Sequence, residues 1–102
     1  MKTITINDAR QFSLKELQKN TLVDETDLRI ELISFEAGQR NNEGSHDHTS
    51  VYQVLEGEAL IREGDVSKRL VKGKLLVIPP NLSHSLENAG GGLLVVLATH
   101  AK

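Results

Sequence analysis

Three histidines carry the clearest chemical signal in the chain. His46 and His48 are two positions apart, and residues with that spacing point to the same face of an extended strand. Two imidazoles on one face can bind one metal ion, at Zn–N distances of about 2.0–2.1 Å. His84 lies two residues from Leu82 and two from Leu86, so we expect it to face inward with them. A buried imidazole needs either a hydrogen-bonding network or a metal ion.

The segment from Gly73 to Asn88 has an ordered pattern around His84. The glycine opens an apolar strand, and a proline pair ends it because proline lacks the N–H that a central strand needs. The spacing G-x5-P-x-N-x2-H-x3-N resembles the second motif of the cupin family, in which glycine is usual at the position of Asn81. Asparagine tolerates positive φ better than other non-glycine residues, so we expect the turn to be kept.

A second segment resembles part of the first cupin motif, G-x5-H-x-H-x3,4-E-x6-G. It contains Gly38, the His46–His48 pair and Gly57, and the interval from Gly57 to Gly73 matches the compact spacing of small microbial cupins. The resemblance implies an all-β fold, a small antiparallel jelly-roll barrel. It also implies that the histidine strands meet inside the barrel, where His84 would be a third metal ligand.

The usual glutamate of the first motif is absent, and two registers are possible. Counting back from Gly57 places Ser50 at that position, whereas counting forward from His48 by the longer spacing places Gln53 there. The Ser50 register also aligns Gly38 with the first glycine of the motif, so we favour it. His46 is a candidate ligand in either register, while His48 would need a shifted loop or a bulge.

The resemblance leaves two classes of function open. Three imidazoles without a carboxylate are similar to the subset of cupins that bind Fe, Zn, Mn or Ni ions, which implies a metal-dependent oxygenase or isomerase acting on a small polar molecule. The alternative is a metal-free or non-catalytic barrel that binds or senses a small ligand. An isomerase of the sugar-isomerase type is a further reading, but the sequence offers no dedicated histidine–carboxylate pair for it.

Two further residues are candidates for the lining of the pocket, and three others are expected to lie in solvent. Arg40 could reach the barrel mouth and bind a carboxylate or phosphate. Tyr52 shares the facing of Ser50 and could line the cavity with its hydroxyl. His100, near the end of the chain, is expected to be a solvated tail residue. Two acidic residues close to the histidines, Asp47 and Glu43, are expected to be surface charges.

The remaining pattern predicts one domain over residues 1–102, with the barrel at about 26–100 and an extension at 1–25. Capping-box spacing predicts a short helix near Leu14 to Lys19. Alternation and turn residues predict strands at 28–35, 66–71, 75–78, 84–87 and 93–98. Two more strands, at 51–55 and 59–62, are expected to form a hairpin around Gly57.

The composition of the chain limits the kinds of molecule that it is expected to bind. The chain has 102 residues, a net charge of −2, no cysteine and 3% aromatic residues, which disfavours nucleic-acid binding. No apolar run is long enough to span a membrane and no signal peptide is visible, so we expect a cytoplasmic protein. Leu93 to Ala98 is apolar on both faces. We expect its outer face to be covered by a second copy in a homodimer or by the N-terminal helix.

Overall fold

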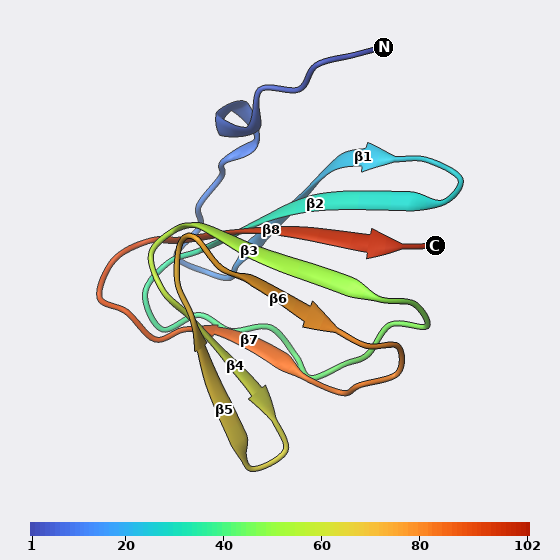
Figure 1. The fold of residues 1–102 in the computed structure, drawn as a ribbon. Coiled ribbons are helices and arrows are strands. Elements are labelled where there is room, and N and C mark those ends of the chain that lie inside the picture. The colour runs from blue at the N-terminus through green and yellow to red at the C-terminus, as the bar shows by residue number, and fades with distance from the viewer.

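The computed structural model describes residues 1–102 as two antiparallel β-sheets that face each other (Figure 1). The strands are β1 (Gln18–Asp24), β2 (Leu28–Phe35), β3 (Ser50–Glu56), β4 (Ala59–Glu63), β5 (Val66–Leu70), β6 (Leu75–Ile78), β7 (Ser85–Asn88) and β8 (Leu94–Ala101). The larger sheet has the order β1-β2-β8-β3-β6 and the smaller one β5-β4-β7. The expected all-β jelly-roll barrel is confirmed, and β1, from within residues 1–25, is part of its larger sheet.

Side chains that point between the two sheets form one apolar core. Its fully buried members from the larger sheet include Phe35, Leu94 and Val96, and the smaller sheet contributes Leu86 from β7. Alternate residues of each strand face this core, as the period-two pattern predicts. The predicted strand limits hold to within one residue at each end, except that β8 continues to Ala101.

Gly57 sends the chain from one sheet to the other. We expected the strands on either side of it to form a hairpin, and that prediction was wrong, because β3 pairs with β6 and β8 whereas β4 pairs with β5 and β7. Gly57 has a φ of 83°, and a Cβ there would lie 2.3 Å from the carbonyl oxygen of Leu93. Only glycine allows the chain to turn this closely past the start of β8.

The two asparagines of the Gly73 to Asn88 segment hold its turns. Asn81 has a φ of 65°, which confirms that this position uses positive φ. Asn88 is buried, and its amide nitrogen donates to the carbonyl oxygens of Glu36 and Gly92, at 3.1 and 2.8 Å. Asn88 therefore holds the loop after β2 and the turn before β8 against β7.

The N-terminal segment lies on the outer side of the larger sheet, away from the smaller sheet (Figure 1). Its helical part is a single 3-10 turn, Ile6–Ala9, rather than the expected helix near Leu14 to Lys19. Residues 14–16 form bends, and the chain then enters β1. A capping box is therefore insufficient here, because the segment is too short to bury an apolar helical face before pairing with β2 begins.

This segment covers part of the outer face of β8. The side chain of Asn20 on β1 donates to the carbonyl oxygen of Ala9, and Arg10 forms an ion pair with Glu56 on β3. Because β2 and β8 lie between β1 and β3, the N-terminal segment passes over both strands. Val95 of β8 points outward on this side and is buried. The chain's own N-terminus is one of the two expected covers, and the homodimer stays a prediction.

Two apolar side chains remain exposed on the outer face of β6. Leu75 is 66% exposed and Val77 is 60% exposed. They belong to an edge strand, since β6 pairs only with β3. The one helical element is four residues long, so no helix of this structure could span a membrane.

Candidate histidine pocket

Polar side chains gather at one end of the space between the sheets. The loop before β3 approaches the turn before β7, and paired backbone hydrogen bonds join Gly44 and His84, with N···O distances of 3.0 and 2.9 Å. The backbone N–H of Asn81 donates to the carbonyl oxygen of His46 at 2.7 Å. The positive-φ turn of the second motif therefore fixes the backbone that carries the first-motif histidine.

His84 is held by two hydrogen bonds in a defined tautomer. Its Nδ1 lies 2.7 Å from the carbonyl oxygen of Leu82, and its Nε2 lies 2.8 Å from the Tyr52 hydroxyl. A carbonyl only accepts, so Nδ1 carries the proton, and in that tautomer Nε2 accepts from the phenol. Burial raises the pKa of Tyr52 to about 12, so the phenol keeps its proton near neutral pH.

His100 forms a second chain of hydrogen bonds. Its Nε2 lies 3.1 Å from Oε1 of Glu31 on β2, and its Nδ1 lies 2.7 Å from the hydroxyl of Ser50 on β3. His100 is 4% exposed, so the expectation of a solvated tail was wrong. The hydrogen bond from His100 lowers the pKa of Glu31, despite the opposing effect of burial, so Glu31 is a carboxylate near neutral pH.

His46 lies between these two groups and is bonded to neither. Its ring centroid is 4.3 Å from that of His100 and 6.3 Å from that of His84. Both nitrogens of its ring are free of hydrogen bonds within the chain. Partial burial lowers the pKa of His46, and electrostatic repulsion from the protonated forms of His100 and His84 lowers it further. The ring is therefore neutral at pH 7, with one nitrogen able to accept and one able to donate.

The other candidate residues lie away from this cluster. His48 is exposed, because residues 46–49 are not a regular strand and the two-residue spacing does not place it beside His46. Gln53 is half-buried on the opposite side of β3 from Tyr52. Arg40 is exposed in the loop after β2, where its backbone bridges to Glu87.

Two openings meet at His46. A pocket of about 130 Å³ lies on one side, where Tyr52, His84, Lys19 and the Asn41–Asn42 pair line its wall. An open cleft of about 280 Å³ lies on the other, lined in part by Arg29, His48 and His100. We call the first opening the histidine pocket. His46 is the imidazole that both openings share.

The arrangement does not fit a metal centre of three imidazoles. Such a centre needs three nitrogen lone pairs that converge on one point at about 2 Å. Both nitrogens of His84 and both of His100 already have partners in the protein, and no group of three or more ligating side chains is arranged to hold a metal ion. A metal bound here would have to displace the Tyr52 hydroxyl or the Ser50 hydroxyl.

Two members of the cluster, His100 and Glu31, were not predicted from the sequence. The pairing of β3 with β8 places Ser50 opposite His100, fifty residues away in the chain. A signal existed in the alternation of β8, because Leu94, Val96 and Ala98 face inward and the next position in that series is His100. Extending the period-two pattern by one step would have placed this histidine inside.

Known proteins resemble the chain in sequence and in fold. A family model described as a cupin domain matches residues 31–100. The structure of an RmlC-like cupin protein from Desulfovibrio desulfuricans is similar at a TM-score of 0.88 and 26% identity, covering 99% of this chain and 96% of that one. The TT1209 structure from Thermus thermophilus matches at a TM-score of 0.90 and 20% identity, covering 99% and 97%.

A cupin superfamily protein from Desulfitobacterium hafniense matches over less of its length. Its TM-score is 0.76 at 26% identity, covering 84% of this chain and 77% of that one. No curated protein matches the sequence. The facing sheets, the two motif segments and the family match over residues 31–100 together show that the chain belongs to the cupin family.

Proposed function

We propose that this cupin binds a small polar molecule in the histidine pocket without a metal ion, with His46 as the group that contacts the ligand. The observation that carries the proposal is the difference among the three histidines. His84 and His100 have both ring nitrogens engaged by the protein, whereas both nitrogens of His46 are free beside a cavity. A free, neutral imidazole at a pocket wall can accept a hydrogen bond and donate one.

The groups around His46 suit a ligand with hydroxyl or carboxylate groups. Lys19 and the side chain of Asn42 line the same pocket and can donate hydrogen bonds to oxygen atoms. The buried Tyr52–His84 pair forms a fixed wall opposite. Few apolar groups line this pocket, so affinity would depend on placed hydrogen bonds rather than on buried apolar area.

The same geometry could support proton transfer. His46 is neutral and therefore able to accept a proton from a bound ligand. Burial and the neighbouring imidazoles lower the pKa of His46, and the Glu31 carboxylate, on the far side of His100, opposes them only in part. An isomerase-type reaction would therefore rely on His46 itself, because both nitrogens of His100 in the His100–Glu31 pair are engaged.

The proposal is tested with protein that has been treated with a chelator. Ligand-observed NMR against a panel of sugars, polyols and hydroxy acids should find a binder in the absence of metal. Binding should be lost in His46→Ala and kept in His48→Ala, because His48 is exposed and does not line the histidine pocket. Binding that appears only after Fe, Mn, Ni or Zn ions are added would instead support the metal-dependent alternative.

Assembly and location form a separate part of the proposal. The exposed Leu75 and Val77 on β6 are where a second copy could bury apolar surface, so we propose a homodimer through this face, in the cytoplasm. Light scattering at micromolar concentration should report a dimer for the wild type. It should report a monomer for Leu75→Glu, and a monomeric wild type would contradict the proposal.

A further inference from the structure

The histidine pocket is too small to hold a typical ligand by itself. Its volume is about 130 Å³. Small-molecule sites usually measure about 300–1,000 Å³. A ligand that reaches His46 must therefore extend beyond this pocket.

A larger groove continues from it. The groove measures about 520 Å³ and is lined by Lys15, Glu16, Leu17, Lys19, Gln39, Arg40, Asn41 and Asn42. Three of these residues, Lys19, Asn41 and Asn42, also line the histidine pocket. The cleft on the other side of His46 shares only that histidine with the pocket. The groove is therefore the better-connected extension of the pocket.

The groove is positively charged in a protein that is negatively charged overall. Lys15, Lys19 and Arg40 supply three positive charges and Glu16 one negative charge, a balance of +2, whereas the whole chain carries −2. None of the three cations takes part in any of the five ion pairs of the structure. Cations without a partner in the protein are available to an anionic ligand.

Hydrogen bonds fix the walls of the groove. The side chain of Gln39 donates to the carbonyl oxygen of Ser13 at 2.7 Å and accepts from the backbone N–H of Glu36 at 2.9 Å. The side chain of Asn41 accepts from the backbone N–H of Leu86 on β7 at 2.8 Å. The N-terminal segment, the loop after β2 and the smaller sheet are thereby joined around one depression.

We propose that the groove binds the distal anionic group, a phosphate or a carboxylate, of a ligand whose polar head enters the histidine pocket. Lys15 and Arg40 would bind the anion, and Lys19 would lie where the head and the anionic end meet. This inference rests on the proposed function, since it assumes that His46 contacts the head. It adds the chemical class of the ligand: a small polyhydroxylated or hydroxy-acid compound with a terminal negative charge.

The test compares compounds that share a head and differ in the distal group. One series is glucose, its terminal phosphate ester and glucuronate, and the other is glycerate and phosphoglycerate. Amide and side-chain NMR shifts are followed in the chelator-treated wild type and in the double variant Lys15→Gln, Arg40→Gln. The charged members should shift Asn42 and His46 together. Their dissociation constants should rise at least about tenfold in the variant, about 1.4 kcal/mol.

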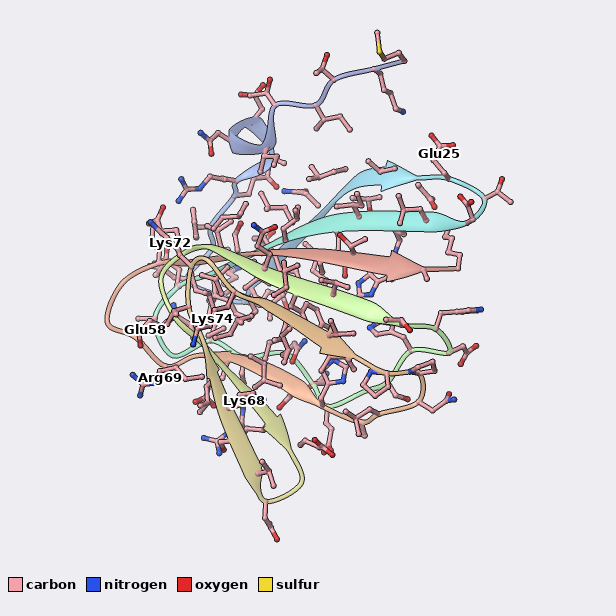
Figure 2. All side chains as sticks on the ribbon, viewed as in Figure 1. Glu25, Glu58, Lys68, Arg69, Lys72 and Lys74 are labelled. Carbon is pink, nitrogen blue, oxygen red and sulfur yellow. The ribbon has the colours of Figure 1, made fainter.

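The matched control is Lys72→Gln, Lys74→Gln, which removes two exposed cations from the turn before β6 (Figure 2). These lysines line neither the groove nor the histidine pocket, so the control should leave the affinity unchanged. An equal loss in the control would overturn the inference, because it would show a general charge effect. The phosphate and carboxylate members distinguish the two anions.

Two other outcomes separate this inference from the proposed function. If uncharged members bind at His46 as well as charged ones and the groove variant has no effect, the inference fails while the proposed function stands. If charged members shift Asn42 but the shifts are unchanged in His46→Ala, binding in the pocket fails instead. The inference is also overturned if no charged member shifts Asn42 at about 10 mM, well above the millimolar range of weak ligands.

Discussion

The two ends of the barrel interior are built from the same strands but hold different kinds of side chain. Along the inward face of β8, Leu94 and Val96 are followed by Ala98 and then His100. On β3, read in the opposite direction, Val54 is followed by Tyr52 and Ser50, and on β2 Phe35 and Ile33 are followed by Glu31. These residues pair across the sheet, so all three strands change from apolar to polar at a similar level.

The apolar end of the interior contributes mainly to stability, and the polar end holds the groups that could bind a ligand. The apolar end buries large side chains completely, and burial of apolar surface is the main favourable contribution to folding. At the polar end Tyr52, His84 and His100 each have a hydrogen-bond partner, which offsets the cost of burying them. His46 differs from these three, since its nitrogens are free and it is only partly buried. Substitutions at the two ends should therefore have different consequences.

The largest effect should come from the apolar end. Phe35 is fully buried, and Phe35→Ala should lower the free energy of unfolding by about 3–5 kcal/mol, because it removes apolar contacts and leaves a cavity. Urea denaturation measures the change. Leu14→Ala, at a position that is 87% exposed, is the control and should change stability by less than about 0.5 kcal/mol. Similar midpoints for the two variants would contradict the location of the core.

A smaller and pH-dependent effect is expected for Glu31→Gln. Because folding lowers the pKa of Glu31 from 4.5, its carboxylate stabilises the folded state above that pH. This stabilisation is lost as pH falls through the lower folded value. At pH 7 the variant should be less stable by about 1.5–3 kcal/mol, typical of a hydrogen bond to a charged group.

The measurement is the urea midpoint as a function of pH for the wild type and the variant. The difference should shrink below about pH 4, as the carboxyl group becomes protonated in the wild type. Glu25→Gln is the control, since Glu25 is an exposed carboxylate (Figure 2). A difference that stays constant from pH 7 to acid would show that the charge of Glu31 has no part in it.

The smallest perturbation is a titration of the unmodified protein. Tyr52 is the only tyrosine and there is no tryptophan, so phenolate absorbance in the near ultraviolet reports this residue alone. Burial raises its pKa from 10.0 to about 12, so the folded protein should give almost no phenolate signal at pH 10. A midpoint near 10 with the fold intact would mean that Tyr52 is exposed and not bonded to His84.

The contrast between the two ends also explains what the sequence could predict. Strand limits and the turn at Asn81 follow from local signals: period-two alternation, a proline pair and a residue that tolerates positive φ. The crossing at Gly57 does not, because a turn glycine between two strands is equally compatible with a hairpin. The choice depends on contacts with Leu93 on a segment much later in the chain.

The site was harder to predict for a related reason. His46 and His84 were recognised from their motif spacing. Tyr52 was expected to line the cavity, but its hydrogen bond to His84 was not predicted. Glu31 and His100 were missed, because they reach the pocket only through strand pairing over long stretches of sequence. The expectation for His48 relied on a continuous strand from residue 46, and the chain becomes a strand only at Ser50. Residue types were informative here, whereas their hydrogen-bond partners required the fold.

The polar end differs from a metal centre in one decisive respect: its histidines serve as hydrogen-bonding groups, and His46 is free for a ligand. Long-range proton–nitrogen NMR of the imidazoles, in chelator-treated protein at pH 7, observes this difference. We predict that His84 is protonated on Nδ1, that His46 is neutral, and that an equimolar amount of Zn²⁺ leaves the His84 nitrogens unchanged. A joint shift of the His46 and His84 nitrogens on adding Zn²⁺ would contradict this prediction, because it would show that a metal displaces the Tyr52 hydroxyl.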